Sequence, residues 1–575
     1  MLGESYWSRA LRARIDRRRL AAIGASGLAA VGLAACGRSG GGAPAATPGA
    51  QTGQASGGTP QTGGTLNVAI NYNPMLDPHK QSSVQLQGAG GVMQRLFRFK
   101  TGLDPQTGLN WDIEPALALS AESPDAITWT IKLRPNVKFQ NFAPVNGHAF
   151  ESDDVKTSFQ RILDPATGSP NRGALDMMSA AQIQTPDKQT VIFKLNYPYS
   201  PFRNLLANPA YATIYPREAY AGGYDPLKQA IGTGPFTLDS VQPDVAYIYK
   251  KNPDYWEKGV PNVDQVKLAI IVDSAQQLAQ FTGKNLDEIL ITDLNTANAA
   301  KQSNPQAAFS RTSNVGPNPL YFQMGDPTGP FLDIRLRRAV GMAVDREALG
   351  KAVYGEYESV VFVPGYVGKW SMTASELPAD IQQYYKYNPA ETKKLLEAAG
   401  ATNQQFKFVR LTGGPFNSAS QQKIAETVNS MVSASGFKTT LISHDYFKDF
   451  VANGKGSRQG YFDKDMMCFF AASSYNDPDD WLFSYFHSKS TSNQEHLSDS
   501  TYDAMVDKER ALVNDDDRLK AVKEIQKYLA DKMYAPSTVG TYNWVLVHPR
   551  VQNYQYTRSS DKMEESYAKT WIKAS

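Results

Sequence analysis

The stretch from residue 37 to residue 63 constrains the fold more than any other feature, because it cannot join a packed core. It contains almost only Gly, Ser, Ala, Pro, Thr and Gln, a composition that gives a flexible tether without an apolar face to bury. A folded body is therefore expected within residues 64–575. A chain of this length exceeds one hydrophobic core, and its hydrophobic fraction of 41% supplies apolar side chains for several.

The tether follows a segment with the pattern of an export signal. An arginine-rich stretch ends at Arg19, and small apolar residues then run from Leu20 to Ala35. This run is short and weak for a transmembrane helix, and no other part of the sequence approaches the length of a membrane span. We interpret residues 1–36 as a lipoprotein signal peptide.

The signal ends in the order Leu33-Ala34-Ala35-Cys36, which resembles the cleavage box of bacterial lipoproteins. In those proteins the cysteine thiol takes a diacylglyceryl group, and several acyl chains together anchor a protein stably. The resemblance implies an extracytoplasmic protein that is anchored to the cell membrane by lipidated Cys36. Residues 16–20, Asp-Arg-Arg-Arg-Leu, also resemble a twin-arginine export signal, so that route and the general secretory route both stay open.

The net charge of the chain lies in this targeting segment. The formal net charge is +3, and residues 1–36 hold six arginines against Glu4 and Asp16, a local balance of +4. The remainder is close to neutral, at about −1. A near-neutral body lacks the basic surface that binds nucleic acid, so nucleic acid is excluded as a partner.

Apolar residues in the body follow the strand period and the helix period in turn. Leu66, Val68 and Ile70 alternate as in a half-buried strand. Ser152 is expected to cap a helix that starts with an acidic pair, and Asn388 to cap one that starts with proline. Further strands are expected at 129–133, 191–195 and 266–271, and further helices at 424–432 and 519–533. The pattern predicts an α/β fold with several lobes.

The sequence contains no motif for catalysis, metal binding or cofactor binding. Its six histidines include no His-Glu-x-x-His pair, and neither a Gly-x-Ser-x-Gly elbow nor a phosphate loop occurs. We interpret the stretch with His487, Glu495 and His496 as a solvated loop rather than a metal site, and Cys468 as a buried core residue. No catalytic residue, metal or cofactor is predicted, which favours a binding protein over an enzyme.

Several stretches of the body carry a more specific signal, because they occur in a fixed order. They include Glu114-Pro115-Ala116-Leu117-Ala118, Asn146-Gly147-His148, Gly232-Thr233-Gly234-Pro235-Phe236, Lys251-Asn252-Pro253-Asp254-Tyr255-Trp256, Asp333-Ile334-Arg335 and Asn476-Asp477-Pro478-Asp479. The ordered set resembles the family 5 extracellular solute-binding proteins, the oligopeptide, dipeptide and nickel receptors of ABC importers. The resemblance covers residues 64–575.

The resemblance implies a periplasmic-binding-protein-like α/β fold, with two main lobes joined by a hinge and an extra domain in the N-terminal half. Lobe I is expected to combine residues 64–98, 227–316 and 538–575, domain II residues 99–226, and lobe III residues 317–537. A small ligand would lie in the cleft between the main lobes, and closure would bury it before delivery to the permease. A monomer is expected.

Ser474 departs from the peptide-binding members of that family. In those relatives an Asp lies four residues before the Pro of the last stretch and pairs with the free ammonium group of the peptide. A neutral hydroxyl cannot compensate an ammonium group, whose burial without a partner costs several kcal/mol. We therefore expect an oligosaccharide or another non-peptide solute rather than an ordinary oligopeptide.

The candidate ligand-binding residues come from this last stretch and from the C-terminal segment. Three aromatic rings are expected to stack on the ligand, and three polar side chains to bond it, with Asp477 in the same set. They are Tyr475, Trp481 and Trp544, and Ser474, Asn476 and Asn543. Two alternatives stay open. A surface-anchored hydrolase of glycans or peptides would show turnover, and a sensory lipoprotein with the same fold would lack a neighbouring permease gene.

Overall fold

The computed structural model describes most of residues 58–574. The residues that it does not describe in that range are 81–87, 103–111, 292, 314–316, 356, 358–359, 414–418, 447, 450–462, 470–476, 491–492, 494, 541 and 558–561. Residues 1–49 and 50–575 form separate units, and all described residues belong to the second. Cys36, the predicted lipid-attachment site, and most of the predicted tether lie outside the described residues.

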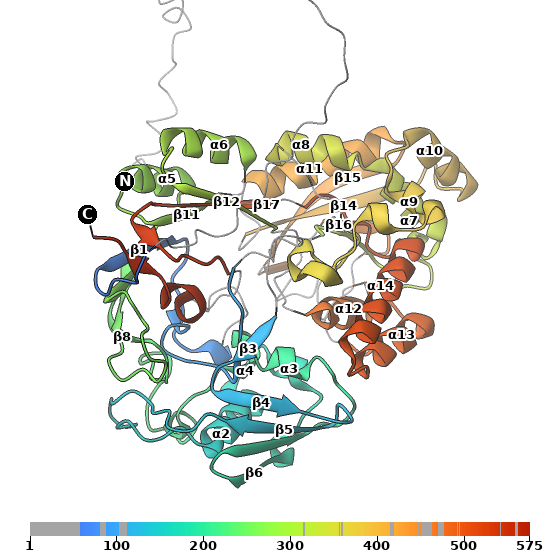
Figure 1. Ribbon diagram of the computed structural model, residues 1–575. Coiled ribbons are helices and arrows are strands. Elements are labelled where there is room, and N and C mark those ends of the chain that lie inside the picture. Colours follow the sequence, from blue (N-terminus) through green and yellow to red (C-terminus); the bar gives the residue numbers. More distant parts are fainter. Residues whose placement is uncertain are drawn as a thin grey trace, which may run out of the picture. The chain divides into compact units, whose positions relative to one another are not determined.

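Lobe I is built on a seven-stranded sheet in the order β12-β17-β11-β1-β10-β9-β8 (Figure 1). As predicted, Leu66, Val68 and Ile70 alternate into the core from strand β1. The strands are β1 (Thr65–Ile70), β8 (Phe236–Gln242), β9 (Ala246–Lys251), β10 (Gln265–Ile270), β11 (Glu288–Ile291), β12 (Ala308–Ser313) and β17 (Tyr542–Val547). Strand β1 is parallel to β10 and β11, whereas β17 is antiparallel to its neighbours β11 and β12. Distant parts of the chain thus share one sheet.

Lobe I also contains helices beside the sheet and a pair of short strands near the end of the chain. Helices α5 (Ser274–Thr282) and α6 (Leu294–Ser303) pack on the sheet (Figure 1). Their core includes Phe281, Ile289 and Leu546. Strands β18 (Val551–Gln552) and β19 (Trp571–Ile572) pair near the end of the chain.

Domain II holds a four-stranded antiparallel sheet and a separate core. The strands, in sheet order, are β4 (Ala118–Glu122), β5 (Thr128–Leu133), β7 (Thr190–Lys194) and β6 (Ile183–Asp187). Helices α2 (Ser152–Leu163), α3 (Phe202–Leu205) and α4 (Pro209–Ala212) accompany the sheet, and β2 (Phe97–Phe99) pairs with β3 (Ile113–Pro115). Phe159, Phe193 and Phe202 meet in the core.

The predicted cap of α2 is wrong by one residue. Glu151, not Ser152, is the N-cap, and the Asp154 carboxylate accepts a hydrogen bond from the Glu151 backbone at 2.9 Å. This reciprocal arrangement is a capping box. It takes the place of a serine cap because both acidic side chains reach the free backbone N–H groups of the first turn.

Lobe III combines a four-stranded sheet with the longest helices. The strands, in sheet order, are β13 (Leu320–Phe322), β16 (Met466–Phe469), β14 (Gln405–Thr412) and β15 (Lys438–Asp445). The helices are α7 (Ile334–Ala343), α8 (Arg346–Tyr354), α9 (Ala379–Gln382), α10 (Pro389–Ala398), α11 (Ala419–Ala434), α12 (Pro478–Phe486), α13 (Ser500–Arg510) and α14 (Asp515–Lys532).

Two predictions in lobe III are confirmed. The Asn388 side chain caps α10 by accepting a hydrogen bond from the Glu391 backbone at 3.1 Å. Cys468 is a buried core residue, and burial raises the pKa of its thiol. Both features depend on residues close together in the sequence, so the sequence alone could predict them.

Two chain segments connect lobe I with lobe III, and they run side by side. One leads from β12 to β13, and the other leads from lobe III into β17. The Thr538 N–H donates to the Pro317 carbonyl at 3.1 Å, and the Asn318 side chain donates to the Val539 carbonyl at 2.7 Å. Asn318 and Thr538 are buried, so these hydrogen bonds hold the two crossing segments together.

Within the described ranges, no helix has both the length and the apolar character needed to cross a membrane.

Candidate functional site

The carboxyl ends of the parallel strands in both sheets lie at the crossing segments. In lobe I, β12 ends at Ser313 and β17 begins at Tyr542, directly beside it in the register. In lobe III, β16 is antiparallel to β13, so Phe469 at its carboxyl end lies opposite Leu320, where the first crossing arrives. Ligands of open α/β sheets bind outside the carboxyl ends of the strands. These two edges therefore define where a ligand would be held.

The candidate residues belong to these two edges. Asn543 and Trp544 lie at the edge of lobe I, as the second and third residues of strand β17. Asp477 lies at the start of α12, which follows β16 in lobe III. Ser474, Tyr475 and Asn476 lie outside the described residues.

The Asp477 carboxylate is held from three sides. It caps α12 by accepting a hydrogen bond from the Asp479 backbone at 2.9 Å. It also binds the Arg518 guanidinium with contacts of 2.5 and 3.1 Å, and it accepts a hydrogen bond from the Asn204 amide of domain II at 2.8 Å. Its negative charge is thus compensated within the protein, and its contacts connect α12, α14 and domain II.

Asp477 is part of a buried charge cluster in which three carboxyl groups face two guanidinium groups. Arg518 also donates to Glu509 at 2.6 Å, and Arg510 lies 3.1 Å from Asp479. Burial raises the pKa of Glu509 to about 8 and also raises the pKa of Asp479. Burial disfavours the charged form of both carboxyl groups, and the two guanidinium groups oppose this effect.

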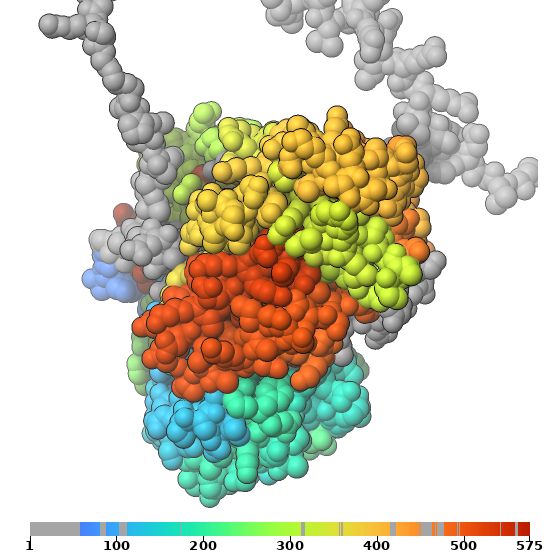
Figure 2. Space-filling view, turned by 90° about the vertical axis from the view of Figure 1, so that its right-hand side faces the viewer, coloured from blue at the N-terminus to red at the C-terminus, as the bar shows by residue number. Residues whose placement is uncertain are grey.

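Arg510 connects lobe III with domain II. Its guanidinium lies over the rings of Tyr199 at 4.7 Å and Phe483 at 3.9 Å, and its backbone carbonyl accepts a hydrogen bond from Ser200 at 2.7 Å. Figure 2 shows the orange-red segment with α12 to α14 seated directly on the blue and teal segment of domain II.

A small cavity opens between domain II and the start of α12. Domain II contributes two tyrosines and two asparagines, and α12 and its cap contribute two aspartates. Its lining includes Tyr199, Asn204, Asn208, Tyr211, Asp477 and Asp480. The cavity is fit for one polar group of a ligand rather than for a whole solute. Sequence reasoning missed the residues of domain II, because only the fold brings them to Asp477.

Trp481 lies in the core of lobe III. It is fully buried, and its ring stacks on Tyr485 at 5.4 Å and meets the edge of Phe362 at 5.9 Å. The structure gives Trp481 a packing role, and its predicted contact with a ligand stays a prediction.

The prediction of a solvated loop around His487 and Glu495 is wrong. Both side chains are fully buried. The Glu495 carboxylate accepts a hydrogen bond from the Phe322 backbone at 3.0 Å, and burial raises its pKa well above the usual range. In the described part of the chain, no group of three or more His, Cys, Asp or Glu side chains is arranged to hold a metal ion.

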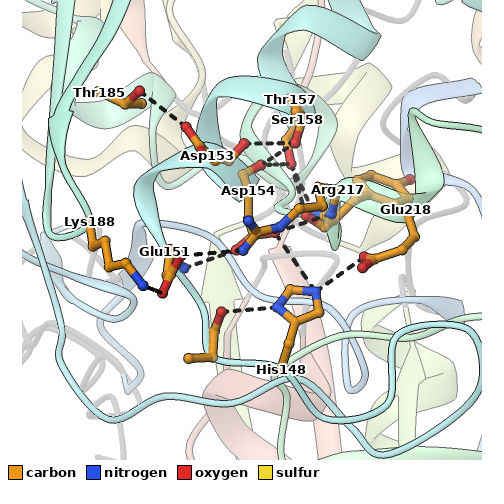
Figure 3. Close-up of polar contacts among 12 residues, drawn as sticks. His148, Glu151, Asp153, Asp154, Thr157, Ser158, Thr185, Lys188, Arg217 and Glu218 are labelled. Carbon is orange, nitrogen blue, oxygen red and sulfur yellow. Dashed lines mark hydrogen bonds and ion pairs between the residues drawn. The ribbon is translucent and has the colours of Figure 1, made fainter.

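A polar cluster in domain II surrounds His148, from one of the ordered stretches (Figure 3). Nε2 of His148 lies 3.1 Å from the Glu218 carboxylate, and Arg217 donates to Asp154 at 3.0 Å. Lys188 binds Glu151 at 2.8 Å. The cations and anions pair with one another, so the cluster fastens the loop before α2 rather than offering free groups to a ligand.

At the edge of lobe I, four side chains share one face of the β12–β17 pair. Arg311 lies opposite Trp544 in the register, and Phe309 and Tyr542 lie two residues away on the same face. Trp544 is only 6% exposed and stacks on Phe309 with ring centroids 5.2 Å apart. The predicted stacking of Trp544 on a ligand and the predicted bond from Asn543 stay predictions. Arg311 and Tyr542 were not predicted, because strand pairing over a long separation brings them together.

Comparison with known proteins agrees with the ordered stretches. Residues 112–493 match the model of the bacterial extracellular solute-binding proteins, family 5 middle. The chain is 27% identical to the heme-binding protein A of Haemophilus influenzae over 523 residues, which is 85% of this chain and 88% of that protein. It is 28% identical to the di/tripeptide-binding protein 2 of Pseudomonas aeruginosa over 447 residues, 73% of this chain and 79% of that protein.

A solved structure shows the same fold. The periplasmic binding protein AgaA of A. tumefaciens R10, in complex with agropinic acid, is similar with a TM-score of 0.70 and 24% identity. The similarity covers 89% of this chain and 99% of that chain. The predicted two-lobed α/β fold of the periplasmic-binding-protein type is confirmed.

Proposed function

Because this chain belongs to the bacterial extracellular solute-binding proteins of family 5, the receptors of ABC importers, we propose that it captures a hydroxyl-rich, non-peptide solute at the membrane surface. Its relatives are binding proteins, and the chain is a binding protein rather than an enzyme.

The anchor is proposed at Cys36, from the order Leu33-Ala34-Ala35-Cys36 at the end of the signal segment. The tether at residues 37–63 would let the folded body reach a permease in the same membrane. Replacement of Cys36 by Ser is expected to release the protein from the membrane fraction. Retention of the Cys36→Ser protein in that fraction would contradict the anchor.

Closure is proposed between lobe I with domain II on one side and lobe III on the other. We keep the segments 64–98, 227–316 and 538–575 for lobe I, 99–226 for domain II and 317–537 for lobe III. The paired crossing segments at Asn318 and Thr538 support this division, since a hinge needs few connections. Ligand would favour the closed form, which the importer then recognises.

The chemistry of the ligand is proposed from the compensated charge of Asp477. Arg518 balances this carboxylate at 2.5 Å, so Asp477 does not replace the ammonium partner that is missing at Ser474. The cavity lining also contains tyrosine and asparagine side chains, residue types that can hydrogen-bond the hydroxyl groups of a sugar or a sugar derivative. The complex of a protein of this fold with agropinic acid shows that the fold is compatible with a non-peptide solute.

A thermal melting screen of the full chain tests the proposal. A solute that binds only the folded state raises the melting temperature, by mass action. We expect a rise with oligosaccharides or sugar derivatives, and none with free-amine dipeptides and tripeptides. A rise with free-amine peptides alone would keep the receptor function and contradict the proposed ligand chemistry.

A further inference from the structure

The edge of lobe I presents a cation whose charge is not balanced by its described neighbours. Arg311 is partly buried near the carboxyl end of β12. Among the described residues, none places a carboxylate oxygen within 4.0 Å of its guanidinium, and none accepts a hydrogen bond from it. The guanidinium carbon lies over the ring of Tyr542, 4.2 Å from the ring centroid.

This state is unusual for an arginine of this protein. Every other arginine in the described ranges that is buried or half-buried has an acceptor, either a carboxylate or a backbone carbonyl. The carboxylate-bound examples include Arg98, Arg161, Arg217, Arg338, Arg410, Arg510 and Arg518. The carbonyl-bound examples are Arg134, Arg337 and Arg346. The N–H groups of a partly buried guanidinium without an acceptor can bond solvent or a ligand.

Aromatic side chains share the face of the sheet on which Arg311 lies. Tyr542 lies diagonally across the β12–β17 ladder on the same face, and the stacked pair of Trp544 and Phe309 continues that face. A guanidinium that stacks on an aromatic ring keeps its edge free, and that edge carries the N–H donors in a planar fork. The fork matches the two oxygens of a carboxylate or phosphate.

A second polar group at this edge also lacks a partner. Asn543 is 5% exposed, and its Oδ1 accepts no hydrogen bond from any described residue. It follows Tyr542 in β17 and points to the other face of the sheet. Buried amides in folded proteins are normally bonded, so the edge has a cation and an amide oxygen that both lack an acceptor or donor among the described residues.

We propose that Arg311 binds an anionic group of the ligand, a carboxylate or a phosphate, at the carboxyl edge of lobe I. The inference rests on the proposed receptor function and narrows its ligand to an acidic, hydroxyl-rich solute. Tyr542 positions Arg311 and does not itself bind the anion.

The first test is the melting temperature of the unliganded full chain with Arg311→Met. A cation that serves a ligand contributes little to folding, and its removal is expected to leave the melting temperature unchanged or higher. A fall of more than about 2 °C would show that Arg311 stabilises the fold, and would overturn the inference. Arg172→Met is the matched control, because Arg172 is exposed and its side chain donates to no residue in the described ranges.

The second test is calorimetry with pairs of probes that differ only in the anionic group. The pairs are trigalacturonate and its methyl ester, glucose 6-phosphate and glucose, and N-acetyl-trialanine and its amide. The acidic member of a pair that binds is expected to bind about 10- to 100-fold more tightly than its mate. Arg311→Met should remove this difference, Arg311→Lys should keep part of it, and Arg172→Met should keep all of it.

The outcomes separate this inference from the proposed function. Tight binding of a neutral member with no gain for its acidic mate overturns the anion site and keeps the receptor. A preference for the acidic member that survives in Arg311→Met also overturns it. If no probe binds the wild-type chain, the proposed ligand class fails, and the melting temperature of Arg311→Met still decides whether the side chain is structural.

Discussion

Replacement of Arg518 by Met is the sharpest test of the buried charge cluster. The guanidinium makes contacts of 2.5 and 3.1 Å with Asp477 and of 2.6 Å with Glu509, and it is 3% exposed. Its removal leaves buried carboxyl groups without their cation. Breaking a buried pair in this way costs about 3–5 kcal/mol, and we expect that loss in the free energy of unfolding at pH 8.

The loss should depend on pH, and its direction follows from proton uptake. Without Arg518, the pKa of the remaining carboxyl groups is higher in the folded protein than in the unfolded chain. Their protonation at low pH removes the unpaired charge, so stability is regained as pH falls. At pH 5.5 the loss is expected to be about 1–3 kcal/mol smaller than at pH 8.

Denaturant unfolding followed by circular dichroism measures both effects. Lys351→Met is the control, because Lys351 pairs with Glu347 at 2.5 Å with side chains that are 62% and 58% exposed. Its cost should stay within about 0.5 kcal/mol. The double variant Asp477→Asn with Arg518→Met should recover at least about 1 kcal/mol. A loss below about 1 kcal/mol at both pH values would refute the reasoning.

Three further predictions concern other parts of the fold. Burial raises the pKa of Glu565 to about 7. The free energy of unfolding should therefore fall by up to about 3 kcal/mol as pH rises from about 4.5 to 7. Denaturant unfolding of Glu565→Gln should show a weaker dependence on pH. Asn388→Ala removes the cap of α10 and should cost about 1 kcal/mol by the same measurement. In Gly232→Ala, the new Cβ would lie 2.1 Å from the Val92 carbonyl oxygen, so a lowered melting temperature is expected; an unchanged value would mean that this backbone can move.

Local patterns in the sequence predicted single elements well. The alternation in β1 and the proline-led start of α10 depend on neighbours in the chain, and both were confirmed. The cap of α2 was misplaced because Ser152 and Glu151 can both cap, and only the position of Asp154 decides between them. The stretch with His487 and Glu495 was misread because its polar composition suggested solvent, whereas the fold buries both side chains.

The candidate site was harder to predict than the fold. The ordered stretches predicted the family and the two-lobed architecture, since each stretch marks a fixed place in that fold. The site depends on contacts over long separations, such as Asn204 with Asp477 and Arg311 with Tyr542. No local spacing signals such pairs, because strand register and the packing of domain II on α12 create them.

The measurement that tests the central claim most directly is calorimetry of a free-amine tripeptide, trialanine, with the wild-type chain and with Ser474→Asp. The account predicts no measurable binding to the wild type, since Asp477 is balanced by Arg518 and Ser474 carries no charge. It predicts at least about tenfold tighter binding to Ser474→Asp, which restores a partner for the ammonium group. Tight binding of trialanine to the wild type, with no gain in Ser474→Asp, would contradict the claim that this receptor takes a non-peptide solute.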